Sequence, residues 1–232
     1  MCCRCIKECP YGFKALCADS LKLLDEMKRN DDNRRNDNVT HIVSSNEAVD
    51  LENARRLQRQ PGDLWISKSS DVGCGRILDK ISNCRKVLML KVGAPVIVTK
   101  NIEGIAFNGA RGTVVGLSEK EDITVKLDGY GLKKLNKVLF SRVDNGKVHT
   151  RMQYPILLAY ALTVHRVQGL TLSRVSINAR GMHCSMQFGV ALSRATSPNH
   201  ISISNLDWKS MKPMPSELET FLQTGETPPL VC

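Results

Sequence analysis

A block of short β-rich runs interrupts the chain, and this feature most constrains what the chain can fold into. The runs consist largely of branched and apolar residues, and they are 87–90, 96–99, 112–117, 123–127 and 138–140. Pairs of turn-forming residues separate several of them: Asn108-Gly109, Asp128-Gly129 and Asn145-Gly146. Five short strands at this spacing predict a small antiparallel β-barrel of about 60–70 residues.

The segments before this block predict α/β structure. Residues 19–29 predict a helix with Leu21, Leu24 and Met27 on one face. Residues 40–44 then predict a short strand. Asn46 can cap a second helix, which runs to about Gln60 and stops at Pro61-Gly62; its inward residues include Val49, Ala54 and Leu57.

The α/β pattern returns after the block. Residues 156–162 predict a strand or its approach, residues 165–170 a loop or short helix, and residues 175–177 a buried strand. A helix over 187–195 and a last strand over 201–203 follow. The simplest topology is therefore one α/β domain into which a small β module is inserted.

This topology predicts four parts of the chain. Residues 1–38 are a Cys-rich and polar segment, and residues 211–232 are a C-terminal tail. Residues 39–86 and 150–210 together form the α/β domain, and residues 87–149 form the inserted β module.

Charge and cysteine usage limit the partners and the compartment. The net charge is +10, which indicates a polyanionic partner such as nucleic acid, or else serves solubility alone. Aromatic residues make up 5%, so phosphate gripping with a few stacked bases is favoured over a broad aromatic platform. Nine cysteines without a regular framework fit a reducing, intracellular compartment. Those within residues 2–17 fit a zinc site, an irregular terminus or buried thiols. Neither a membrane span nor a secretory signal is expected.

A polar cluster follows the predicted strand at 156–162. Thr163 offers a hydroxyl, His165 a ring nitrogen, Arg166 a charge and Gln168 an amide, and Gly169 ends the turn with a bare backbone N–H. Such a turn at the end of a strand suits contact with the phosphates of a nucleotide or a nucleic-acid strand. The alternative is a capped turn with a solvated arginine.

A second stretch, residues 188–195, ends an apolar helix with an arginine. A helix that packs against the protein can aim Arg194 at the charge that develops on a phosphoryl group. The alternative is a surface arginine on an amphipathic helix.

These two stretches resemble motifs of one helicase family. Residues 163–169 are similar to the fifth motif of the Pif and RecD-like helicases, usually Thr-Ile-His-Lys-Ser-Gln-Gly, and residues 190–195 resemble their sixth. Residues 90–101 and 108–112 resemble the run into the family's barrel module. Residues 41–50, with Asn53 and Arg56-Leu57, resemble the start of the family's second RecA-like lobe. The resemblance covers roughly 39–207, with the motifs in order. Arg166 replaces the usual lysine and keeps the charge, whereas Val167 replaces a serine and loses a hydroxyl.

The resemblance implies a role for each matching residue. Arg194 matches the arginine finger that stabilises charge on the γ-phosphate of ATP. Gln168 and Gly169 match the motif that links nucleotide state to DNA grip, and Thr163, His165 and Arg166 match positions that face the DNA backbone. The β module resembles an SH3-like domain that helps clamp single-stranded DNA. Its candidate contacts are Lys100, Asn101 and Arg111.

The sequence lacks the elements that grip ATP itself. A phosphate loop ends in Gly-Lys-Ser or Gly-Lys-Thr, whereas Ala110 follows the glycine pair Gly104 and Gly109. We therefore expect the chain alone to hydrolyse no ATP and to bind no cofactor, and we expect ATP and Mg²⁺ only in an intact 5′–3′ DNA helicase that includes the missing N-terminal lobe. The expected site is the nucleus or the mitochondrion if the chain is eukaryotic. A stand-alone single-stranded DNA-binding module and a zinc-stabilised scaffold are the alternatives.

Overall fold

The computed structural model describes residues 18–30, 39–81, 83–118, 123–182 and 185–207. The chain divides into two compact units. Unit 1 comprises Met1–Val49 and Leu162–Cys232, and unit 2 comprises Asp50–Ala161. In the described part of the chain, every helix is too short or too polar to cross a membrane.

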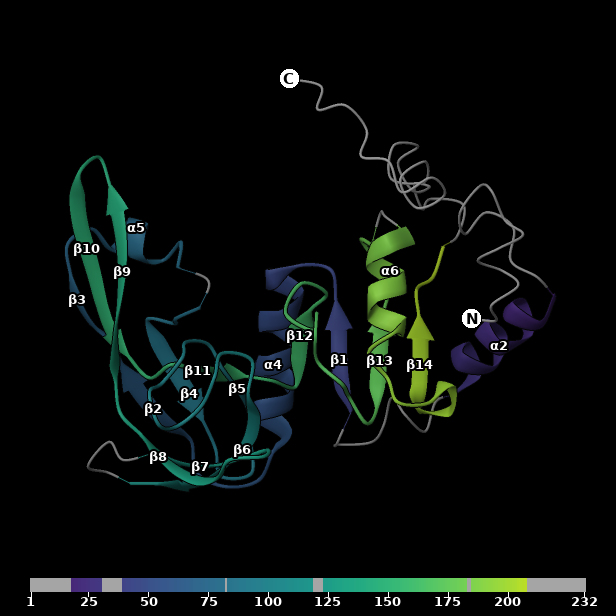
Figure 1. Ribbon diagram of the computed structural model, residues 1–232, viewed down its shortest axis with the longest axis horizontal. Helices are drawn as coiled ribbons and strands as arrows, with labels where there is room; N and C mark the ends of the chain where they lie inside the picture. The colour runs from purple at the N-terminus through teal and green to yellow at the C-terminus, as the bar shows by residue number, and fades with distance from the viewer. Residues whose placement is uncertain (1–17, 31–38, 82, 119–122, 183–184, 208–232) are drawn as a thin grey trace. The chain divides into compact units, whose positions relative to one another are not determined.

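Unit 1 is built on a four-stranded sheet in the order β12-β1-β13-β14, whose strands lie side by side in Figure 1. The strands are β1 (Thr40–Val43), β12 (Ala161–Thr163), β13 (Val175–Asn178) and β14 (Ile201–Ser204). β13 pairs in parallel with both β1 and β14. Ile42, Ile177 and Ile203 are register partners on one face and are 0% exposed. Ser176 and Ser202 on the other face are buried as well, as expected for a parallel sheet that is covered on both faces.

Helices complete unit 1. α2 (Ala18–Arg29) packs against β14 and lies beyond it in Figure 1. Of the three residues predicted to share one face of this helix, Leu24 and Met27 are buried and Leu21 is 48% exposed. α6 (Ser185–Leu192) buries Phe188 and Ala191 completely. A 3₁₀ turn, η2 (Pro198–His200), leads into β14.

Helix α4 (Asn46–Arg59) begins in unit 1 and continues into unit 2. The Ser45 hydroxyl accepts a hydrogen bond from the Ala48 N–H at 3.2 Å, so Ser45 rather than Asn46 acts as the side-chain cap. Leu57 is buried as predicted, whereas Ala54 is exposed and the polar Asn53 is buried instead.

The described residues of unit 2 form three antiparallel sheets. The largest has the order β11-β5-β6-β7-β8, formed by β5 (Pro95–Val98), β6 (Arg111–Leu117), β7 (Ile123–Leu127), β8 (Gly131–Leu135) and β11 (Ile156–Leu158). A two-stranded sheet pairs β2 (Trp65–Lys68) with β4 (Val87–Leu90). The third has the order β3-β10-β9, formed by β3 (Ser70–Val72), β9 (Val138–Asp144) and β10 (Lys147–Gln153). A short helix, α5 (Gly75–Leu78), packs on this third sheet.

All five predicted β-rich runs are strands, but they belong to three sheets. β5, β6 and β7 share the largest sheet, whereas β4 pairs with β2 and β9 pairs with β10. The described strand pairs leave the largest sheet open between β11 and β8, so the small barrel stays a prediction. The compact unit runs from 50 to 161, beyond the predicted module boundaries of 87 and 149 on both sides.

A buried guanidinium holds the third sheet to α5. Arg151 on β10 is 1% exposed. Its Nε and Nη2 donate to the two carboxylate oxygens of Asp71 at 2.9 and 2.8 Å, and Nη2 also donates to Asp79 at 2.7 Å. The Arg151 hydrogen bond lowers the pKa of Asp71, and burial opposes this shift. The cluster thus joins β3, β10 and the end of α5.

The cysteine-rich residues 2–17, with the expected zinc alternative, and the tail at 211–232 lie outside the described residues. The described part contains no group of His, Cys, Asp and Glu that could hold a metal ion. Cys84 is buried there, and burial raises the pKa of its thiol to about 11. Its sulfur is therefore protonated near neutral pH and a poor nucleophile.

Candidate functional site

The stretch 163–169 forms a hydrogen-bonded turn at the end of strand β12. The Thr163 carbonyl accepts hydrogen bonds from the Arg166 and Val167 N–H groups at 3.0 and 3.2 Å. The Val167 carbonyl then accepts from the Leu170 N–H at 3.0 Å. Gly169 has φ +78°, a conformation that favours glycine, and this explains why the turn ends there. The sequence predicted a loop or short helix over 165–170, and the structure has a turn there.

The turn separates exposed polar groups from a buried anchor. His165, Gln168 and Gly169 are exposed, and Arg166 is half-buried. Val167 is 0% exposed and Thr163 is 7% exposed. The turn therefore offers an imidazole, an amide and a bare backbone to a ligand, while the Thr163 hydroxyl is largely covered.

Arg194 is the second residue after helix α6 and reaches back to this turn. Its Nη1 donates to the Leu170 carbonyl at 3.4 Å, one residue after Gly169. Its Nε donates to the Val190 carbonyl at 3.1 Å, and its Nη2 donates to the Ser193 hydroxyl at 2.8 Å. The half-buried guanidinium thus sits beside the glycine-ended turn. It has more N–H donors than these contacts engage among the described residues.

Backbone pairing fixes the two stretches together. The Leu172 N–H donates to the Arg194 carbonyl at 2.8 Å, and the Thr196 N–H donates to the Leu172 carbonyl at 3.2 Å. These bonds form a parallel bridge between Leu172 and Ala195. The position of Arg194 beside the turn therefore depends on main-chain hydrogen bonds as well as on its own side chain.

Two of the three predicted DNA contacts in unit 2, Lys100 and Asn101, form hydrogen bonds within the protein. The exposed Lys100 donates from Nζ to the Leu139 carbonyl at 2.7 Å and lies 5.5 Å from the centre of the Phe140 ring. Asn101 accepts from the Asn108 N–H at 2.7 Å through Oδ1. Its amide therefore closes the loop between these two residues.

Arg111, the third, begins β6 and is half-buried. Burial lowers its pKa from the ordinary value, and the charge of Asp128 acts in the opposite direction. The Arg111 carbonyl accepts from the Asp128 N–H at 2.8 Å. This hydrogen bond joins the start of β6 to the residue after the end of β7.

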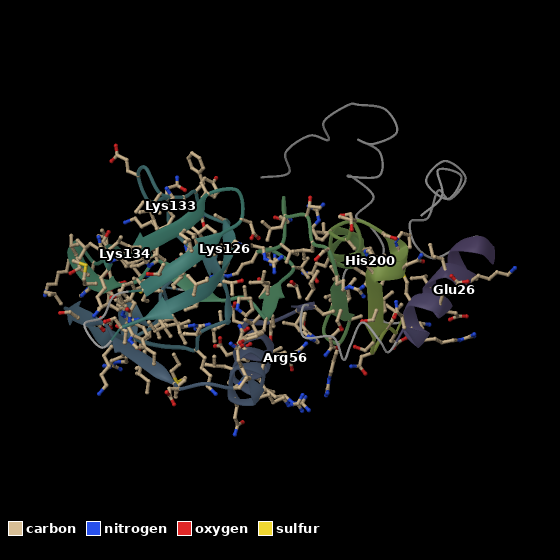
Figure 2. All side chains as sticks on the ribbon, turned by 90° about the horizontal axis from the view of Figure 1, so that it is seen from below. Glu26, Arg56, Lys126, Lys133, Lys134 and His200 are labelled. Carbon is tan, nitrogen blue, oxygen red and sulfur yellow. The ribbon has the colours of Figure 1, made fainter. Side chains whose placement is uncertain are left out.

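Sequence reasoning missed a basic face on the largest sheet of unit 2. Lys126 on β7 and Lys134 on β8 are exposed, and both are labelled on these strands in Figure 2. Lys126 pairs with Leu132, and Lys134 pairs with Thr124. Because side chains alternate along a strand, Lys126 and Lys134 share the face opposite the buried Val125 and Leu127. Recognising β8 as a strand would have revealed this face.

Known proteins that resemble the chain are helicases. The rat "ATP-dependent DNA helicase PIF1" is 33% identical over 185 residues, which are 73% of this chain and 28% of the rat protein. The human protein of the same name is 30% identical over 199 residues, or 79% of this chain and 30% of the human one. The predicted resemblance to the Pif family is confirmed. No family model matches the chain.

Solved Pif1 structures have the same fold. The crystal structure of Pif1 helicase from Candida albicans aligns with a TM-score of 0.75 and 24% identity, covering 91% of this chain and 55% of that one. Bacteroides Pif1 in complex with ADP-AlF3 and ssDNA aligns with a TM-score of 0.73 and 26% identity, covering 90% and 50%. The chain therefore has a Pif1-type α/β helicase fold with mixed sheets. It spans 28–30% of the rat and human Pif1 sequences.

Proposed function

We propose that this chain is the part of an ATP-dependent 5′–3′ DNA helicase that closes on a nucleotide held by another lobe and transmits the nucleotide state to DNA. The hydrogen bond from Arg194 to the Leu170 carbonyl is the observation that carries this proposal, because it puts a fixed cation beside the Gly169 turn. A guanidinium stabilises the charge spread over the oxygens of a transferring phosphoryl group. Unit 1 then corresponds to the second RecA-like lobe.

Within this proposal, each residue of the turn has a separate role. Arg194 acts as the arginine finger, and Gln168 and Gly169 sense whether the γ-phosphate is present. His165 and Arg166 contact the DNA backbone, which their exposed and half-exposed positions permit. Thr163 is 7% exposed, so it offers DNA less surface than His165 and Arg166 do.

Unit 2 supplies the DNA clamp in the same proposal. Lys100, Asn101 and Arg111 line the start of an SH3-like module, and the exposed Lys126 and Lys134 extend its positive surface. Lysine and arginine contacts to phosphates release counterions, so they give affinity without sequence preference. The partner in this proposal is single-stranded DNA, the same class of ligand as the ssDNA in the Bacteroides Pif1 complex.

ATP and Mg²⁺ belong to the intact helicase in this proposal. The 232 residues contain no Gly-Lys-Ser or Gly-Lys-Thr phosphate loop, so the chain needs an N-terminal lobe as its partner and is inactive as an ATPase by itself. A DNA-processing enzyme of this type acts inside the cell, in the nucleus or mitochondrion of a eukaryote.

A chimaera tests the role of Arg194. This chain replaces the matching part of Bacteroides Pif1, and DNA-stimulated ATP hydrolysis is measured for the parent, Arg194→Ala and Arg194→Lys. We expect Arg194→Ala to lower kcat by about 10³-fold or more, as for other arginine fingers, with KM for ATP changed far less. Arg194→Lys restores only a small part, because lysine lacks the planar fork.

Ser193→Ala is the matched control, because it removes one hydrogen-bond partner of Arg194 and leaves the guanidinium in place. We expect this control to keep most of the parent's turnover. A parental kcat in Arg194→Ala, with the chimaera folded and active, would show that Arg194 only caps helix α6.

A stand-alone single-stranded DNA-binding module is the second candidate, favoured by the exposed Lys126 and Lys134 on one sheet face. Fluorescence anisotropy of a labelled oligonucleotide with the purified chain separates the two. Tight binding by the chain, together with a chimaera that lacks ATPase activity, supports the binding module over the helicase part.

A further inference from the structure

The chain passes between the two units twice. The first crossing lies within helix α4, between Val49 and Asp50, and the second lies within strand β12, between Ala161 and Leu162. Thr163, the first residue of the candidate turn, follows the second crossing by two positions. Whatever fixes the second crossing therefore also fixes the start of the turn.

A buried amide joins these crossings on the side of unit 2. Asn53 lies one turn into α4 from the first crossing and is 7% exposed. Its Oδ1 accepts from the Ala161 N–H at 2.9 Å. Its Nδ2 lies 3.3 Å from the Ala161 carbonyl and 3.4 Å from the Leu158 carbonyl. One side chain thus binds both polar groups of the last residue before the second crossing.

The same face of α4 holds this segment at two further points. Leu57 is 4% exposed and belongs to the same buried core as Tyr160. The Tyr160 hydroxyl donates to the Gln60 carboxamide oxygen. Asn53 and Leu57 lie four residues apart on α4, and Gln60 follows its last residue with i+7 spacing from Asn53, so the three lie along the same side. α4 and the residues 158–161 therefore form one packed piece.

We infer that Asn53 is a positioning residue that fixes the distance between the two crossings. An apolar side chain at this inward position would bury as well, but it would leave the Ala161 N–H and carbonyl without Asn53 as a partner. A buried polar group that loses its hydrogen bond costs free energy, so the segment would shift or open. Under the proposed function, such a shift moves the start of the turn that carries Thr163, His165 and Gln168.

Amide hydrogen exchange measured by NMR on the full chain tests the local contact. In Asn53→Ala the Ala161 N–H loses its acceptor, and we expect it to exchange roughly tenfold faster. Asn53→Asp keeps the size and the acceptor oxygen but turns a carboxylate oxygen toward two carbonyls. The Ala161 N–H therefore stays nearer its parental rate in Asn53→Asp.

A second measurement separates positioning from local packing. Nitroxide labels are attached through unnatural amino acids at the exposed Glu26 in unit 1 and Lys126 in unit 2, and pulsed dipolar EPR gives the distribution of distances between them. We expect this distribution to broaden in both Asn53 variants. Asn178→Ala is the control: its Oδ1 accepts from the Arg180 N–H at 3.1 Å and from Asn205, all within unit 1, so the parental width is expected.

The exchange and EPR results together decide whether Asn53 is a positioning residue. Faster Ala161 exchange together with a broader distribution supports the inference. Faster exchange with an unchanged distribution overturns it, because Asn53 then serves local packing alone. Unchanged Ala161 exchange in Asn53→Ala also overturns it. Neither measurement needs ATP or DNA, so a failure of the helicase proposal leaves this test intact.

Discussion

Replacing Asp71 by asparagine removes the carboxylate that holds the buried guanidinium of Arg151. Arg151 is 1% exposed, and the side chain of Asp71 is 18% exposed. Two of the guanidinium's hydrogen bonds go to Asp71, at 2.9 and 2.8 Å. Breaking a buried ion pair from one side costs about 3–5 kcal/mol, because the remaining charge stays out of water. Here Asp79 and the new amide oxygen still accept, so we expect Asp71→Asn to lower the free energy of unfolding by about 3 kcal/mol.

Asp79→Asn is the matched control in the same cluster. Asp79 accepts a single hydrogen bond from Arg151, at 2.7 Å, and its side chain is 55% exposed. Solvent screens such a contact, so the loss is expected to stay below about 1 kcal/mol.

Urea unfolding followed by circular dichroism at neutral pH gives both values, provided that the urea dependence of the free energy is the same in the parent and the variants. Equal losses for Asp71→Asn and Asp79→Asn, or a loss below about 1 kcal/mol for Asp71→Asn, would refute the claim that burial decides the strength of these contacts.

Three smaller predictions concern unit 2. Because Arg151 lowers the pKa of Asp71, ionised Asp71 stabilises the fold above the ordinary carboxyl pKa of about 4, and this stabilisation is lost as pH falls through the lowered pKa. The free energy of unfolding of Asp71→Asn should therefore depend less steeply on pH in acid than that of the parent. Gly112→Ala would place a Cβ 2.9 Å from the Leu127 Cα, a backbone clash worth about 1–3 kcal/mol in thermal unfolding, whereas Gly116→Ala meets Thr124 at an ordinary 3.6 Å and should stay within about 1 kcal/mol. Replacing Lys126 and Lys134 together by alanine should weaken single-stranded DNA binding and reduce the slope of log affinity against log salt by about 0.7 per lost phosphate contact, measured by anisotropy titration; an unchanged slope would place DNA elsewhere.

Hydrophobic pattern predicted the strands whose buried residues are apolar. β5, β7 and β13 bury Val96, Val125 and Ile177, and all three strands were found from sequence. Turn residues were equally informative: Asn145 and Gly146 both have positive φ, which suits the tight hairpin between β9 and β10.

Strand β10 was missed because its pattern is inverted. Its buried residues are polar or charged, namely His149, Arg151 and Gln153, whereas Val148 is 62% exposed and Met152 is 36% exposed. A strand of this kind depends on side-chain hydrogen bonds such as the Arg151–Asp71 pair, which joins residues 80 positions apart. Local sequence pattern cannot reveal such a partner.

The residues of the candidate site, and their place on one lobe, were predicted from sequence, but the contacts that join them were not. The polar turn and the arginine were both evident in sequence, and their order suggested a common motif set. Their contact depends on the bridge between Leu172 and Ala195 and on the bond from Arg194 to Leu170, which span more than twenty residues. Only the folded chain establishes that these pieces are neighbours.

Val167 limits which residues of this turn can contact a ligand. The motif that residues 163–169 resemble usually has serine at this position, and valine lacks the hydroxyl that could make a polar contact there. Val167 is 0% exposed, so its side chain packs into unit 1 and presents nothing to a ligand. Burial of a branched apolar side chain instead anchors the middle of the turn, at a gain of about 1.5–3 kcal/mol. Under the proposed function, contacts to a phosphate therefore come from the exposed His165 and Gln168, the half-exposed Arg166 and the bare backbone of Gly169.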